Sequence, residues 1–79
     1  MRAVQHLRSN RHKTLRTALS VARMAAGLSQ RELSDKLKRS PSFVGKYEAG
    51  ERKLEVLEFV EVCEALGVDP AQILKLLKD

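Results

Sequence analysis

The sequence has little of what several classes of protein depend on. It holds one cysteine, three aromatic residues and no tryptophan in 79 residues. A single cysteine, Cys63, excludes an internal disulfide framework and fits a reducing compartment, which we expect to be the cytoplasm. Three aromatic rings are too few for a single-strand binder that stacks bases. No apolar run approaches the ~18 residues of a membrane span, so we expect no membrane partner.

Side-chain arrangements that carry catalysis or bind metals are also missing. No serine or cysteine stands in a recognisable arrangement with a histidine and an acid, and no glycine-rich loop would cradle a phosphate. His6 and His12 lack a carboxylate or thiol at ligand spacing, which disfavours a metal site. Cys63 lies in an apolar stripe, where a core position is favoured over a redox sensor. We therefore expect a protein that is not an enzyme and uses no cofactor and no metal.

What the sequence does have is an uneven distribution of charge. Residues 1–53 carry thirteen lysines or arginines against four acids, whereas residues 54–79 carry two lysines against six acids. The first part should attract a polyanion and the second should avoid one. A run of charge is often only a solvated face, so this asymmetry indicates nucleic acid without establishing it.

Helical spacing and cap chemistry predict five helices and no strand. Ser29 and Glu32 have the spacing of a capping box, and Ser40-Pro41 and Asp69-Pro70 each place a cap before a proline. The expected helices cover residues 13–26, 29–37, 40–49, 55–66 and 70–78. We therefore expect one compact all-α domain over residues 13–79, preceded by a flexible basic arm over residues 1–12.

The fourth expected helix has one apolar stripe and one acidic side. The stripe contains Val56, Phe59, Val60, Cys63 and Leu66. Three glutamates lie opposite and are expected to face solvent, namely Glu58, Glu61 and Glu64.

The segment most informative about function is residues 28–50. Only Lys38 and Arg39, with Ser40 as the cap, separate two short helices, so the helices must cross steeply and the second one protrudes. On a helical wheel, the inner side of this second helix carries Val44, Tyr47 and Glu48. Its outward residues are Pro41, Ser42, Gly45 and Lys46, with Phe43 at the border. An outward face of small residues and one cation can enter the major groove of DNA, which is about 12 Å wide.

These residues resemble the lambda-repressor-like, Cro/cI-type helix-turn-helix family. The positions in register are Gly27, Leu28, Ser29, Gln30, Glu32, Leu33, Leu37, Ser40, Val44, Glu48 and Gly50. The similarity continues through Val62–Pro70 and covers about residues 15–77 in all. It implies a five-helix lambda-repressor-like domain with its helix-turn-helix at about residues 29–49.

The resemblance also implies a role for individual residues. Base edges would be read by Pro41, Ser42, Phe43 and Lys46. From its place on the outward face, we expect Lys46 to contact a guanine. The DNA backbone would be contacted by Gln30, Arg39, Ser40, Arg52 and Lys53. Arg23 and Glu48 match a pair of positions that forms a structural ion pair between the first and third helices.

Three departures from the family pattern stand in the motif itself. Phe43 is larger than the usual residue at its position and could meet a thymine methyl. Lys38 replaces the usual turn glycine, so we expect strain and a slightly altered turn. Gly45 costs the recognition helix about 1 kcal/mol relative to alanine, and it would allow a close approach to the duplex.

Sequence-specific binding of double-stranded DNA is the leading interpretation, with repression by promoter occlusion. Operator-binding modules of this kind usually pair, so we expect a homodimer on a pseudo-palindromic operator. Leu57 and Leu76 project away from the expected core, and the interface is expected at Leu57, Ile73, Leu76 and Leu77. Arg2, Arg8 and Arg11 of the arm could reach an adjacent groove. Two alternatives remain open: an antitoxin that represses its own operon, and a protein-interaction module that has lost DNA binding.

Overall fold

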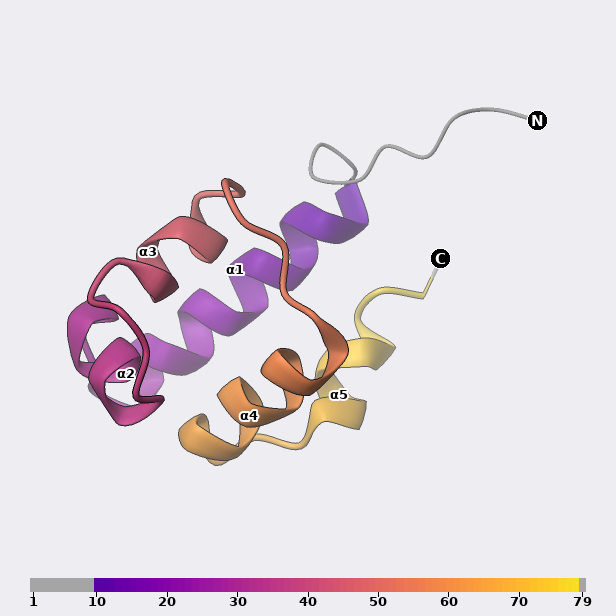
Figure 1. The fold of residues 1–79 in the computed structure, drawn as a ribbon. Coiled ribbons are helices and arrows are strands. Elements are labelled where there is room, and N and C mark those ends of the chain that lie inside the picture. Colours follow the sequence, from indigo (N-terminus) through magenta and orange to yellow (C-terminus); the bar gives the residue numbers. More distant parts are fainter. Residues whose placement is uncertain (1–9, 79) are drawn as a thin grey trace.

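Five helices form the part of the chain that the structure, a computed structural model, describes, which is residues 10–78 (Figure 1). They are α1 (Asn10–Ala25), α2 (Gln30–Lys36), α3 (Phe43–Glu48), α4 (Val56–Leu66) and α5 (Pro70–Lys75). Within residues 10–78 there is no strand, so the all-α expectation is confirmed. Helix α1 is the longest and lies centrally, in contact with α3, α4 and α5, while α2 packs on α3.

Local cap chemistry determines where α2 and α5 begin. The Ser29 hydroxyl accepts a hydrogen bond from the Glu32 backbone at 3.0 Å, and the Glu32 carboxylate accepts one from the Ser29 backbone at 2.8 Å. This is the capping box that the sequence predicts. Asp69 accepts a hydrogen bond from the Ala71 backbone at 3.0 Å, with Pro70 as the first helical residue.

Three helix ends differ from the sequence-based expectation by three residues, and the others agree to within one. Helix α1 begins at Asn10, three residues earlier than expected, and α5 ends at Lys75. Helix α3 begins at Phe43 because a turn occupies residues 41–42, in which the Phe43 backbone donates to the Ser40 carbonyl at 3.0 Å. The expected cap at Ser40 is therefore wrong, and Ser42 holds the cap position without a side-chain hydrogen bond.

The core is a single cluster of side chains from all five helices. Its buried members are Leu19, Leu33, Phe43, Val44, Tyr47, Phe59, Val62, Cys63, Leu66 and Ile73. Burial raises the pKa of the Cys63 thiol to about 11, so the reactive thiolate is disfavoured.

The buried face of α4 is rotated from the stripe read in the sequence. Val56 is 77% exposed, because it is the first residue of the helix and lies at the edge of the packed face. Glu58, expected among the solvated acids, is only 7% exposed. Its burial has a specific cause, which is a pair of arginines described below.

Candidate nucleic-acid interface

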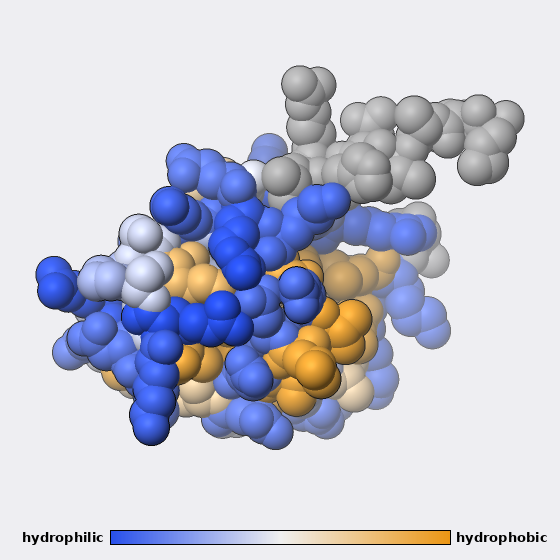
Figure 2. Space-filling view, in the orientation of Figure 1, coloured by the Kyte–Doolittle hydropathy of each residue, from blue (hydrophilic) through white to orange (hydrophobic). Residues whose placement is uncertain are grey.

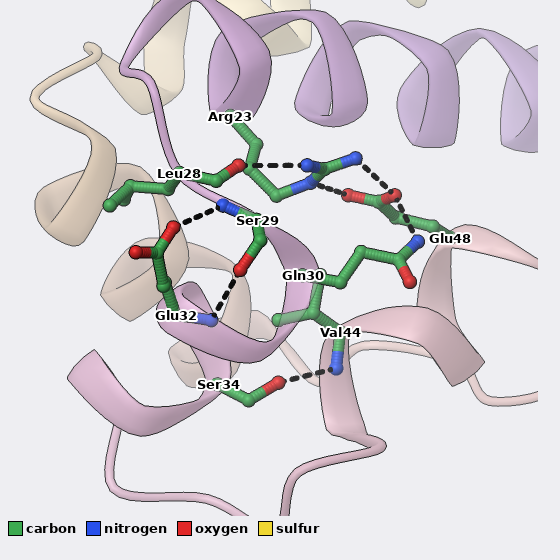
Figure 3. Close-up of polar contacts among 8 residues, drawn as sticks. All are labelled: Arg23, Leu28, Ser29, Gln30, Glu32, Ser34, Val44 and Glu48. Carbon is green, nitrogen blue, oxygen red and sulfur yellow. Dashed lines mark hydrogen bonds and ion pairs between the residues drawn. The ribbon is translucent and has the colours of Figure 1, made fainter.

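Helices α2 and α3 are fastened to each other by a buried hydrogen bond (Figure 3). The hydroxyl of Ser34, within α2, accepts from the backbone N–H of Val44 at 3.1 Å. Both residues are fully buried. Because the first N–H groups of a helix have no partner inside it, this bond satisfies one of them and fixes α3 on α2. The sequence analysis did not find this contact, since a serine within a helix gives no sign of a partner ten residues away.

The turn between the two helices keeps the left-handed geometry that a glycine would favour. Lys38 has φ 59°, and the Arg39 backbone donates to the Ser34 carbonyl at 2.9 Å. The expected strain at Lys38 is therefore present, because a side chain crowds the backbone in this conformation. Instead of an altered turn, the chain has the left-handed turn with a lysine in it.

A chain of polar contacts connects α1 to both helices of the motif (Figure 3). Arg23 donates to the two carboxylate oxygens of Glu48, from Nε at 2.8 Å and from Nη2 at 3.1 Å. Its Nη1 donates to the Leu28 carbonyl at 2.8 Å. The hydrogen bond to Glu48 raises the pKa of Arg23, despite the opposing effect of burial. This fork-to-fork pair is the arrangement that the sequence analysis expected between the first and third helices.

Gln30, expected on a DNA phosphate, extends this chain of contacts. Its Nε2 donates to Glu48 Oε1 at 2.9 Å. Gly45 lies directly against it, since a Cβ at that position would come within 3.2 Å of Gln30 Oε1. The glycine in the third helix therefore makes room for Gln30, a reason that the sequence did not reveal.

Three of the four expected base-reading residues face solvent. Pro41, Ser42 and Lys46 are exposed along one edge of α3 and the turn before it. Phe43 is not: it is 5% exposed and packs edge-on against Tyr47, with ring centroids 5.5 Å apart. A ring in this position belongs to the core. The prediction that Phe43 reads bases is therefore wrong.

The expected backbone contacts fall into two groups. Gln30, Ser40 and Lys53 are exposed. Arg39 and Arg52 are engaged with the buried acid Glu58, to which Arg39 Nη2 approaches to 2.9 Å and Arg52 Nη1 to 2.8 Å. Both side chains keep about a third of their surface exposed, at 35% and 37%.

A hollow of about 500 Å³ lies between α1 and α3, next to the exposed edge of the motif. Its lining includes Lys13, Arg16, Gln30 and Gly45. Arg16 Nη1 lies 2.8 Å from His12 Nδ1, and its guanidinium lies about 3.0 Å from where a Cβ on Gly50 would be. Sequence reasoning missed Lys13 and Arg16. The signal that could have found them is a pair of cations three residues apart, on the side of the first helix nearest the motif.

The residues expected at a dimer interface differ in how far they are exposed to solvent. Leu57 is 73% exposed and Leu76 is 57% exposed, whereas Leu77 is half-buried and Ile73 belongs to the core. Ile73 is thus corrected to a core residue, because α5 uses it to pack on the body. Val56 and Leu74 are also exposed, which the sequence did not indicate. Figure 2 shows hydrophobic atoms gathered near the start of α4 and beside α5.

Part of the expected N-terminal arm lies outside the described residues, including Arg2, His6 and Arg8. The part that is described is helical, since Arg11 and His12 belong to α1. Burial, and then the positive charge of Arg16, lower the pKa of His12.

Known proteins share both the sequence pattern and this arrangement of helices. Residues 19–73 match a protein family described as helix-turn-helix. An XRE-family like protein from Pseudomonas syringae pv. tomato str. DC3000 is 45% identical, covering 85% of this chain and 82% of its own, with a TM-score of 0.79. The chain belongs to the XRE-type helix-turn-helix family.

Two further solved structures are similar to this XRE-type chain. The clp gene regulator ClgR from C. glutamicum is 28% identical, covers 87% of this chain and 88% of its own, and has a TM-score of 0.77. A mutant of the restriction-modification controller protein C.Esp1396I shares the fold at 19% identity, with 87% of each chain covered and a TM-score of 0.76. No curated protein matches the chain significantly. Membership of the family supports a DNA-binding transcriptional regulator.

The described part of this XRE-type chain contains neither a metal-binding cluster nor a membrane-spanning helix. Among residues 10–78, no group of three or more His, Cys, Asp or Glu side chains could hold a metal ion. None of the five described helices is long and apolar enough to cross a membrane.

Proposed function

We propose that the chain is a cytoplasmic, sequence-specific binder of double-stranded DNA that represses transcription by occluding a promoter. The observation that carries this proposal is the exposed edge of Pro41, Ser42 and Lys46, held on a rigid α2–α3 frame. Two small residues and one long cation allow an α-helix to enter the major groove without steric conflict. The frame matters because side chains that read bases must be held in one orientation.

Backbone contacts on both sides of this edge would align the duplex. Gln30 lies at the start of α2, while Lys53 lies in the loop after α3. Lys13 and Arg16 extend the positive surface along α1, beside the hollow. Contacts of this kind fix the register of the protein on DNA and are independent of sequence. The net negative charge of residues 54–79 disfavours their approach to phosphates, which supports an interface on the first part of the chain.

A homodimer on a pseudo-palindromic operator completes the proposal. One recognition helix covers only a few base pairs, so two copies related by a two-fold axis supply the remaining specificity. The exposed leucines Leu57 and Leu76 lie in the acidic part of the chain and offer apolar surface to a second copy. Half-sites would then be spaced about 10 base pairs apart.

Lys46 gives the sharpest test of base reading. Binding is measured by fluorescence anisotropy on a duplex selected from a random pool and on a scrambled duplex of equal length. Lys46→Ala should weaken specific binding by about 1–3 kcal/mol and relax the preference at one base pair, because a lysine on guanine O6 and N7 is lost.

Lys53→Ala is the matched comparison, since it removes the same charge from a residue expected on a phosphate. It should weaken both duplexes alike and lower the log–log salt slope by about one. If Lys46→Ala weakened both duplexes equally, Lys46 would be a backbone contact. A wild-type protein that bound no duplex at any salt concentration would refute DNA binding altogether.

A further inference from the structure

A cluster of charges lies behind the start of α3, and its centre is the buried carboxylate of Glu58. Arg52 donates to both oxygens of this carboxylate, from Nη1 to Oε1 and from Nη2 to Oε2, each at 2.8 Å. Arg39 Nη2 lies 2.9 Å from Oε2, and the Glu55 backbone donates to Oε1 at 3.0 Å. The cluster therefore ties the α2–α3 turn and the α3–α4 loop to α4.

The two arginines also lie over the ring of Phe43, the first residue of α3. Their guanidinium carbons lie 4.8 Å (Arg39) and 5.0 Å (Arg52) from the centroid of the Phe43 ring. A cation over an aromatic face is attracted by the electrons of the ring. Phe43 directly follows Ser42 and precedes Lys46 by three residues. A displacement of the Phe43 backbone would therefore carry both exposed side chains with it, because all three belong to the same short segment.

We propose that Glu58 is a positioning residue for DNA recognition. It holds Arg39 and Arg52 against Phe43, which fixes the orientation of α3, and it leaves the exposed third of each guanidinium side chain for a phosphate. This inference rests on the proposed function, because it assigns a residue to the same interface. Glu58 itself, being buried, would touch no DNA.

Removing the charge of Glu58 has two effects on DNA binding, and they predict opposite changes in affinity. Removal of an acid makes the protein more positive, which by itself strengthens binding to every duplex. Loss of the anchor lets the two arginines and Phe43 move, which weakens only the binding that depends on the orientation of α3. The ratio of specific to non-specific affinity therefore separates the two effects.

Glu58→Gln tests the proposal, with Glu64→Gln as the matched control. Glu64 is an exposed acid on the same helix, so its replacement changes the net charge equally. Affinities for the selected and the scrambled duplex are measured by anisotropy at one salt concentration, below the melting temperature of each variant. For Glu58→Gln, specific affinity should fall about tenfold while non-specific affinity stays level or rises. Glu64→Gln should keep the wild-type ratio.

A ratio unchanged in Glu58→Gln would overturn the proposal, whether or not the melting temperature falls. Arg52→Lys provides a second variant in case Glu58→Gln does not fold. Lysine keeps the charge but cannot donate to both carboxylate oxygens in a fork, so the ratio should fall here too. A wild-type ratio in that variant would equally overturn the proposal. A wild-type protein without preference for any duplex would instead refute the proposed function, and this inference with it.

Discussion

Lys38 holds a backbone conformation that its side chain disfavours. Its φ of 59° lies in the left-handed region, where a Cβ crowds the neighbouring carbonyl oxygen. Lys38→Gly should therefore raise the free energy of unfolding by about 0.5–1 kcal/mol, after the entropy cost of glycine in the unfolded chain. Urea unfolding followed by circular dichroism measures this. Lys36→Gly, at the last residue of the right-handed α2, is the control and should lower stability. A Lys38→Gly protein less stable than wild type would contradict the argument.

Glu58 makes stability depend on pH in the acid range. The hydrogen bonds from Arg52, then the Glu55 backbone N–H and the charges of Arg52 and Arg39, lower its pKa from 4.5 to about 2. Because its pKa is lower in the folded state, the Glu58 carboxylate raises the free energy of unfolding, and this contribution is fully present above about pH 4.5. That stability is lost as the pH falls from 4.5 towards 2.

The check compares urea unfolding of wild type and Glu58→Gln at several pH values between 7 and 2.5. The stability difference between the two proteins should be largest near neutral pH and should shrink below pH 4.5. Glu64→Gln should follow the wild-type curve throughout. A difference that stayed constant with pH would show that charge plays no part in the role of Glu58.

At the scale of the helices, Gly45 and Gln30 connect the stability of α3 to its proposed function. Gly45→Ala would improve the helix propensity of α3 by up to about 1 kcal/mol. The new methyl group would press on Gln30 Oε1, which is exposed and free to move aside. We therefore expect a higher urea midpoint together with weaker DNA binding, because Gln30 leaves its position beside Glu48. Gln30→Ala, measured in parallel, should show the binding loss without the gain in stability. Unchanged DNA affinity in Gly45→Ala would indicate that Gln30 does not contact DNA.

The features that the sequence could predict are the local ones. The start of α2 depends on Ser29 and Glu32, three residues apart, and could be read directly. The start of α3 could not, because Ser40 before a proline has the composition of a cap, whereas the chain makes a turn there and buries Phe43.

Contacts between distant elements also escaped prediction, since each depends on the packing of whole helices. Ser34 meets Val44 only because α2 crosses α3. Glu58 is buried only because the two loops beside α3 bring arginines to it. On a helical wheel it could not be distinguished from the solvated acids of the same helix. The Arg23–Glu48 pair, equally distant in the chain, was anticipated through the family resemblance alone.

For the molecule as a whole, the exposed leucines Leu57 in α4 and Leu76, directly after α5, predict a dimer. Leu76→Glu should weaken self-association roughly tenfold, since it places a charge in an apolar contact. Sedimentation velocity of the free protein and of its DNA complex measures this. Gln72→Glu introduces the same charge within α5, four residues before Leu76, and should leave association unchanged if Leu76 is at the interface. A wild-type protein that stays monomeric both free and on DNA would exclude the dimer.

The brevity of α3 has a consequence for how mutations would affect regulation. A helix of six residues does not persist alone in water, since isolated helices need about 12–15 residues to be even marginally stable. Its shape is supplied by Ser34, Phe43 and the rest of the folded body. A destabilising change in the core would therefore reduce the number of molecules able to read DNA without altering the sequence that each folded molecule prefers. Genetically, such changes would resemble a lowered dose of the regulator, whereas changes at Ser42 or Lys46, the residues proposed to read bases, would resemble a different regulator.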